Sequence, residues 1–151
     1  MLTFDDIVDS FSRVSPKKLV VSDDRRILTY NCLQQNGNNL AIFLKKNGII
    51  KGDRIAFLAY NRVEFAEILY ATSKLGVMVV PINFRLSKKE VSEIFKDATP
   101  SFFLYEKDFL KVKNYIVKNN LITKKKILCI DTKGYQKLIL NSKTQNKLNL
   151  K

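Results

Sequence analysis

The sequence contains no histidine and only two cysteines among its 151 residues. Without histidine, the chain cannot form a Ser-His or Cys-His catalytic pair or a His-ligated metal site. Cys32 and Cys129 lie far apart and follow no pairing pattern, so we expect two reduced thiols and no structural zinc site. These absences exclude several common kinds of catalytic and metal centre.

Long uncharged apolar runs are missing as well. The most apolar stretch, residues 63–84, is interrupted by three charged side chains, so it does not resemble a membrane-spanning helix. Three aspartates stand among the first nine residues, where a signal peptide needs positive charge. We therefore expect a cytoplasmic protein without a transmembrane segment.

The formal net charge of +13 is unevenly distributed. Residues 106–151 hold 12 lysines against three acidic side chains, a net charge of +9, which leaves +4 for the first 105 residues. A basic third of this kind is compatible with a solvated surface, a polyanion-binding surface or weak attraction to a membrane surface. Few aromatic residues interleave with these lysines, and a surface on which bases stack needs more of them. We therefore expect no nucleic-acid partner.

The spacing of apolar residues predicts an alternation of strands and helices after an N-terminal helix and a β-hairpin. Thr29 is an N-cap candidate, Ser87 and Glu90 form a capping-box pattern, and Gly48 and Gly76 are placed to end helices. Helices are predicted over 2–12, 29–47, 62–75, 87–97 and 108–119, and strands over 19–21, 27–28, 54–60, 77–80, 102–105 and 127–130.

This alternation predicts an α/β fold with a mainly parallel sheet flanked by helices. The continuous apolar run 77–80 is typical of a strand buried on both faces, and Pro81 is expected to close it. Gly37 falls on the apolar stripe of its helix, which predicts close backbone packing there. We expect one folded unit over residues 1–131 and a frayed, Lys- and Asn-rich tail over residues 132–151.

Four segments, in the same order and at similar intervals, resemble the adenylate-forming superfamily, in particular the acyl-CoA synthetases. They are Leu-Thr-Tyr at 28–30, Ile-Lys-Gly-Asp-Arg-Ile-Ala-Phe-Leu at 50–58, Asn-Arg-Val-Glu-Phe at 61–65 followed by Lys-Leu-Gly at 74–76, and Val-Pro-Ile-Asn-Phe-Arg-Leu at 80–86. Cys32 departs from the family, which often has Glu at that place. The resemblance covers most of residues 1–131 and implies part of the N-terminal subdomain of the adenylate-forming fold.

The resemblance implies a two-step reaction for the complete enzyme. A carboxylate attacks ATP to give an acyl-adenylate, and coenzyme A then displaces AMP, so ATP, Mg and coenzyme A are the implied cofactors. The family's Ser/Thr/Gly-rich phosphate loop and its catalytic lysine have no counterpart here, because the five glycines are widely dispersed. We therefore expect this chain alone to be inactive, to bind none of these cofactors, and to contain no catalytic or metal-ligating residue.

One candidate binding residue follows from the resemblance. In some relatives the arginine of the Asn-x-Arg-Leu turn approaches the phosphates of coenzyme A, which makes Arg85 a candidate phosphate contact; the alternative is an arginine that only orders its loop. We expect structural roles for Arg54 and Arg62 and a turn-capping role for Asp53.

Three functional readings stay open at this point. The first is an N-terminal fragment of an acid–CoA ligase, whose partner would be the remainder of a split synthetase or a second copy of itself. The second is a non-catalytic interaction or regulatory module that keeps this subdomain. The third is a basic α/β module that binds nucleic acid.

Overall fold

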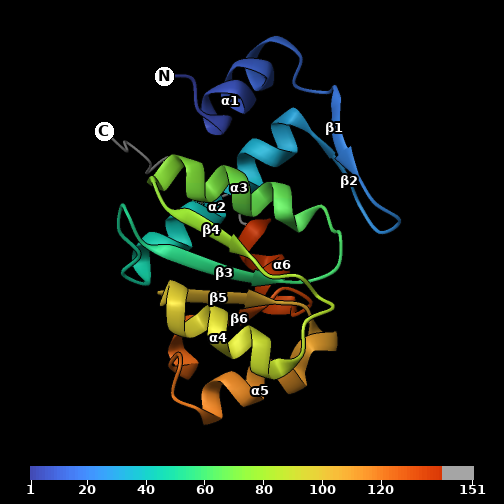
Figure 1. Cartoon of the computed structure of the whole chain (residues 1–151). Coiled ribbons are helices and arrows are strands. Elements are labelled where there is room, and N and C mark those ends of the chain that lie inside the picture. Colours follow the sequence, from blue (N-terminus) through green and yellow to red (C-terminus); the bar gives the residue numbers. More distant parts are fainter. Residues whose placement is uncertain (141–151) are drawn as a thin grey trace.

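A computed structural model describes residues 1–140 of the chain (Figure 1). Two short 3-10 helices, Lys107–Phe109 and Lys124–Lys126, precede α5 and β6. The other elements are α1 (Phe4–Val14), β1 (Leu19–Ser22), β2 (Ile27–Thr29), α2 (Tyr30–Lys46), β3 (Arg54–Leu58), α3 (Glu64–Leu75), β4 (Met78–Pro81), α4 (Lys88–Ala98), β5 (Phe102–Tyr105), α5 (Leu110–Lys118), β6 (Ile127–Cys129) and α6 (Lys133–Ile139).

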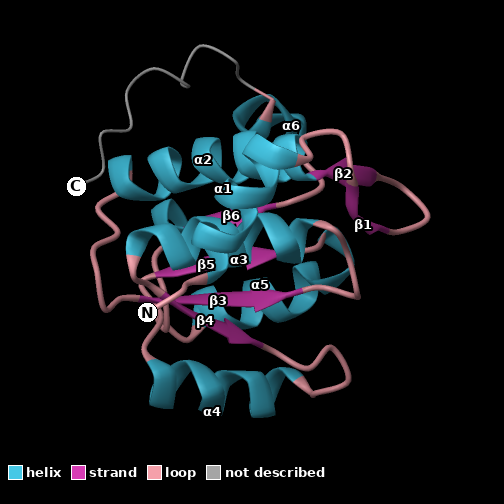
Figure 2. Ribbon diagram, turned by 90° about the horizontal axis from the view of Figure 1, so that it is seen from above, coloured by secondary structure: helices cyan, strands magenta, loops and turns pink. Residues whose placement is uncertain are grey.

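The central sheet is parallel throughout, with the strand order β4-β3-β5-β6 (Figure 2). Helices α2, α3 and α6 pack on one face of this sheet, and α4 and α5 pack on the other. The chain moves from β3 outward to β4 and then crosses back past β3 to β5, so the direction of winding reverses between β3 and β5. The α/β fold predicted from the alternation of elements is confirmed.

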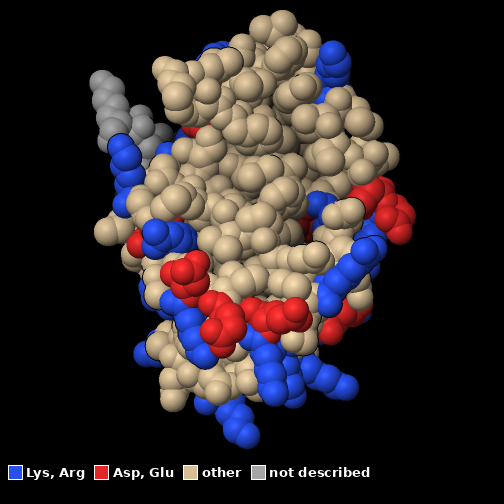
Figure 3. Space-filling model, in the orientation of Figure 1, with Lys and Arg blue, Asp and Glu red and all other residues tan. Residues whose placement is uncertain are grey.

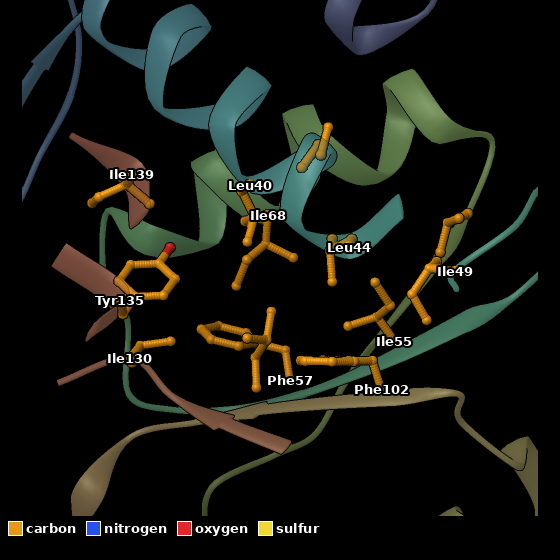
Figure 4. Packing of buried hydrophobic residues seen from close by; sticks show 14 of the residues in the cluster. Leu40, Leu44, Ile49, Ile55, Phe57, Ile68, Phe102, Ile130, Tyr135 and Ile139 are labelled. Carbon is orange, nitrogen blue, oxygen red and sulfur yellow. The ribbon is translucent and has the colours of Figure 1, made fainter. Parts of the chain in front are cut away.

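The larger core lies between the sheet and the helices α2, α3 and α6 (Figure 4). Leu40, Leu44 and Ile68 point toward Phe57 and other strand side chains. The second core, on the other face, is centred on the fully buried strand β5 and on α4 and α5. Two layers of helices over one sheet therefore bury both faces of the inner strands, as parallel sheets require.

Strand β4 differs from the expectation of burial on both faces. It is an edge strand, and Met78 is 48% exposed. Pro81 is the last residue of the strand, so it closes β4 as expected. The N–H groups of Met78 and Ile82 donate to carbonyls of the β3 side, so by alternation Pro81 faces the outer edge, where its missing N–H costs no ladder hydrogen bond.

The predicted helix ends are confirmed by the backbone. Thr29 Oγ1 accepts a hydrogen bond from the N–H of Cys32, and Ser87 and Glu90 form the capping box of α4. Gly48 and Gly76 follow α2 and α3 with φ values of +80° and +65°, in the left-handed region that favours glycine. Local chemistry therefore sets the lengths of these helices.

The expectation of a frayed tail from residue 132 is wrong for α6. Thr132 Oγ1 accepts a hydrogen bond from the N–H of Tyr135, and the side chains of Tyr135 and Ile139 are buried against the core. Asn39 Nδ2 also donates to the carbonyl of Ile139 at 2.7 Å. The sequence gives little indication of this short helix, because only two well-buried apolar residues, one turn apart, anchor it. The rest of the predicted tail, residues 141–151, lies outside the described residues.

Within residues 1–140, none of the helices combines the length and the apolar composition needed to cross a membrane.

Candidate functional site

The carboxyl ends of the four parallel strands meet at one edge of the sheet. Residues 59–62 follow β3, residues 82–84 follow β4, Glu106 follows β5, and Asp131 follows β6 by two positions. In open α/β sheets, ligands bind outside this edge, near the point where the winding direction reverses. The side chains at this edge are therefore the first candidates for a binding site.

A largely apolar cleft of about 570 Å³ opens between the segments that follow β3 and β4. Its volume falls within the range of roughly 300–1,000 Å³ that is typical of small-molecule sites. Phe57 and Phe65 stack with their ring centroids 5.5 Å apart, and Tyr60 packs edge-on against Phe84 at 5.0 Å. The cleft is lined by Phe57, Ala59, Tyr60, Asn61, Arg62, Phe65, Pro81, Ile82, Asn83 and Phe84.

Arg85 lies directly after this lining, in the loop between β4 and α4. Its side chain is exposed, and its guanidinium carbon lies 5.7 Å from the centroid of the Phe84 ring. Asn83 Oδ1 accepts the backbone N–H of Arg85 at 3.0 Å, which orders the turn. Arg85 forms no ion pair with any residue of the described part of the chain, so its guanidinium is available to an anion there.

The crevice between β3 and β5 is filled by the chain's own carboxylate. Glu106 is 1% exposed, and its Oε2 accepts the backbone N–H of Tyr60 at 2.9 Å. Its Oε1 lies 3.1 Å from Arg62 Nη1 and 3.3 Å from Arg25 Nη1. The position where a ligand would sit in many α/β proteins is therefore occupied by a structural ion pair.

Arg62 is the centre of a charged cluster. It contacts Glu64 through two hydrogen bonds of 3.0 and 2.9 Å, and Asp131 Oδ1 through one of 2.6 Å. Burial alone would lower the pKa of Arg62, but the hydrogen bonds and charges of Glu64 and Asp131 raise that pKa above its ordinary value. The interpretation of Arg62 as a structural residue is thus confirmed.

The β1–β2 hairpin completes this cluster from the outside. Arg26 Nη2 lies 2.5 Å from Glu67 Oε1, and Asp23 Oδ2 accepts the backbone N–H of Val63 at the start of α3. Tyr135 donates its hydroxyl to Glu67 Oε2 at 3.0 Å, and burial together with the Glu67 charge raises the pKa of Tyr135 well above its ordinary value. The sequence predicts only a β-hairpin here and gives its charged residues no partners. The partners lie 40 or more positions away, and no local pattern pairs them.

Two other sequence assignments lie away from the cleft. Asp53 Oδ2 accepts the backbone N–H of Ile50 at 2.9 Å, so its turn-capping role is confirmed. Arg54 is exposed at the first residue of β3, at the opposite edge of the sheet.

The residues present do not fit a magnesium–triphosphate group. The acidic side chains at the strand ends are engaged by arginines, and among residues 1–140 no group of three His, Cys, Asp or Glu side chains is arranged to hold a metal ion. The first turn of α3, which could receive a phosphate, carries the Glu64 carboxylate instead. What the edge offers is an apolar cleft with the exposed guanidinium of Arg85 beside it.

Sequence comparison with known proteins agrees with the resemblance to the adenylate-forming superfamily. Residues 8–149 match the family described as AMP-binding enzyme. The chain is 36% identical over 94 residues to the fatty acid–[acyl-carrier-protein] ligase ScoC of Streptomyces coeruleorubidus, covering 62% of this chain and 18% of that protein. It is 42% identical over 78 residues to the long-chain-fatty-acid–CoA ligase FadD13 of Mycobacterium tuberculosis, covering 52% of this chain and 16% of that protein.

Solved structures agree. The N-terminal domain of FACL13 from Mycobacterium tuberculosis superposes with a TM-score of 0.82 at 28% identity, covering 92% of this chain and 35% of that structure. The fatty acyl CoA synthetase of Mycobacterium tuberculosis superposes with a TM-score of 0.81 at 27% identity, covering 91% of this chain and 28% of that structure. The sequence matches to the ligases ScoC and FadD13 cover less than a fifth of the length of either protein.

Proposed function

Because the chain belongs to the family of AMP-binding enzymes, we propose that it forms the first part of the N-terminal domain of an acid–CoA ligase. In the complete ligase, a carboxylate displaces pyrophosphate from ATP to give an acyl-adenylate, and the thiol of coenzyme A then displaces AMP. The observation that supports this proposal best is the superposition of 92% of the chain on the N-terminal domain of FACL13.

This segment alone is inactive in adenylation. Stabilising the charge of the triphosphate requires donors and a cation around it, and electrostatic stabilisation of this kind is usually the largest catalytic term. At the strand ends the arginines are engaged by Glu64, Glu106 and Asp131, so they are not free to serve ATP. ATP and Mg are therefore bound by other parts of the ligase.

The contribution of this segment to the complete ligase is a surface beside the cleft that receives a phosphate of coenzyme A. Arg85 carries this role because its guanidinium is exposed and is held near the Phe84 ring. The planar group offers forked N–H donors that match phosphate oxygens. The apolar cleft next to it suits the less polar parts of a substrate.

Inactivity is tested with the purified chain. Carboxylate-dependent exchange of pyrophosphate into ATP is expected to stay at the level of a heat-denatured control. Exchange above that level would show that the chain holds a triphosphate site, and would overturn this part of the proposal.

The phosphate contact is tested in a ligase that contains this segment, as the natural longer polypeptide or as a chimera with a family member. Arg85→Ala is expected to raise the KM for coenzyme A about tenfold, since a hydrogen bond to a charged group contributes about 1.5–3 kcal/mol and this one is exposed. Adenylation measured by pyrophosphate exchange is expected to stay unchanged.

The matched control is Lys89→Ala, which removes a neighbouring exposed positive charge. An equal effect of both variants would indicate general electrostatics. If Arg85→Ala leaves the KM for coenzyme A unchanged, Arg85 does not bind the phosphate and only orders its loop.

A further inference from the structure

A buried carboxylate fixes the backbone directly after β3. Glu106 Oε2 accepts the N–H of Tyr60, and Glu106 Oε1 lies 3.1 Å from Arg62 Nη1, so both oxygens of the carboxylate are engaged. A hydrogen bond to an ionised acceptor is stronger than one between neutral groups. The backbone of Tyr60 is therefore tied to the end of β5, which fixes the point from which its side chain leaves the main chain.

The ring of Tyr60 packs against two other aromatic rings. Its centroid lies 5.0 Å from that of Phe84, at an interplanar angle of 63°, and 5.1 Å from that of Phe109. Edge-on and tilted pairs at such distances are favourable beyond the apolar area that they bury. Phe84, which belongs to the segment after β4, is thus held against the segment after β3.

Phe84 in turn supports Arg85. The guanidinium carbon of Arg85 lies over the Phe84 ring, 5.7 Å from its centroid, within the range of about 6 Å for a cation–π contact. Asn83 fixes the backbone of the same arginine by accepting its N–H. A long exposed side chain loses conformational freedom when it binds a ligand, and a contact that orders it beforehand reduces this cost.

The direction of the N–H donors matters more for Arg85 than for the lysines of this region. On the face drawn in Figure 3, positive side chains are numerous over the lower half, where α4 and α5 lie in Figure 1. One of the lysines also lies over a ring, because Lys88 Nζ is 5.2 Å from the centroid of Tyr115. An ammonium is a compact charge with rotating donors, whereas the flat guanidinium binds phosphate oxygens through parallel N–H groups. The guanidinium therefore gains more from being held in one orientation.

We propose that Phe84 and Tyr60 are positioning residues that hold the guanidinium of Arg85 ready for a phosphate of coenzyme A. The contacts form one series, from the carboxylate of Glu106 through the rings of Tyr60 and Phe84 to Arg85. The phosphate contact rests on the proposed function, but the series of contacts does not. Since an exposed cation–π contact is weak, loss of the ring is expected to weaken the binding of coenzyme A about threefold.

The first measurement uses the 151-residue chain without any ligand. In its proton–nitrogen NMR spectrum, the side-chain Nε–H signal of Arg85 is identified by its absence in Arg85→Lys. The proton is expected upfield of its position in free arginine, because the ring current of Phe84 acts on it. Phe84→Leu and Tyr60→Ala are expected to move the signal back toward the free position, whereas Tyr60→Phe keeps the ring and retains the shift. Far-UV circular dichroism confirms that each variant is folded.

The second measurement uses the complete ligase in which Arg85→Ala is tested. Phe84→Leu is expected to raise the KM for coenzyme A about threefold, and to cause no further rise in the Arg85→Ala background. Tyr60→Ala is expected to act in the same way, and Tyr60→Phe to restore the wild-type KM. The Kd of coenzyme A, measured by isothermal titration calorimetry, is expected to follow the KM.

Tyr115→Leu is the matched control. It likewise removes a ring beneath an exposed cation, here Lys88, and is expected to leave the KM for coenzyme A unchanged. An effect equal to that of Phe84→Leu would show that the order of the positive surface in general matters, and would overturn the positioning role.

Two other outcomes also overturn the positioning role. One is an Arg85 signal that Phe84→Leu leaves in place. The other is a KM that Phe84→Leu raises equally in the Arg85→Ala background, because the ring would then contact the ligand itself. If Arg85→Ala leaves the KM unchanged while Phe84→Leu still moves the Arg85 signal, the rings hold the guanidinium and it is the proposed phosphate contact that is wrong.

Discussion

Gly37→Ala tests a close approach between two helices of the fold. A Cβ atom at residue 37 of α2 would lie 2.2 Å from Tyr70 Cδ1 and 2.8 Å from Tyr70 Cγ. Tyr70 cannot easily move away, because its ring is fully buried and its hydroxyl is bonded to Asp9. The predicted close packing at this glycine is thus confirmed, and the substitution must push α2 and α3 apart.

The size of the effect follows from two opposing terms. Replacing glycine by alanine inside a helix stabilises it by about 1 kcal/mol, whereas overpacking a core costs about 1–3 kcal/mol and occasionally more. Since 2.2 Å is far below any van der Waals contact, we take the upper end and expect a net loss of about 2 kcal/mol. For a domain of this size, that lowers the Tm by about 4–8 °C.

Urea unfolding followed by far-UV circular dichroism measures this loss. Gly134→Ala is the control, because its Cβ would meet only Thr132 Oγ1 at 3.6 Å, and we expect it to be neutral or slightly stabilising. In a Tyr70→Ala background the obstacle is gone, so Gly37→Ala is expected to become stabilising. A Gly37→Ala variant as stable as the wild type, or an unchanged loss in the Tyr70→Ala background, would refute the reasoning.

Two further predictions concern the charged cluster. Tyr135→Phe removes a hydrogen bond to the buried carboxylate of Glu67 and is expected to reduce the free energy of unfolding by about 1–3 kcal/mol; a loss below about 0.5 kcal/mol in urea titrations would mean that α6 contributes little there. Partial burial raises the pKa of Asp131, but the hydrogen bonds from the Lys107 N–H and Arg62 outweigh it and bring the pKa below its ordinary value of 3.8. The resulting stability is present above pH 3.8 and is lost as the pH falls through the lowered pKa, so Asp131→Asn is expected to flatten the acid side of the stability profile; identical profiles would contradict this.

The order and type of the elements could be predicted from the sequence because local chemistry decides them. The capping box at Ser87 and the left-handed glycines Gly48 and Gly76 act within a few residues, and the sequence displays them directly. The parallel sheet followed from the alternation of apolar runs with helices. These features required no knowledge of tertiary contacts.

What could not be predicted depends on neighbours in space. An apolar run such as 77–80 has the same composition in a central strand and in an edge strand, and only the sheet order shows that β4 is at the edge. The burial of α6 depends on a carbonyl contact with Asn39, which lies 100 positions earlier. At the candidate site, the turn that carries Arg85 was recognised through resemblance alone, whereas the ion pairs that fill the crevice had no signal in the sequence.

The charged cluster also constrains the order of events as the chain is synthesised. Glu67 contacts both Arg26, 41 positions earlier, and Tyr135, 68 positions later. While α6 is still missing, Glu67 keeps Arg26 and Asn36 but lacks the hydroxyl of Tyr135, so a buried carboxylate has one donor fewer than in the complete fold. Docking of the hairpin, although it emerges early, is therefore expected to reach its full strength only after the segment around residue 135 has left the exit tunnel.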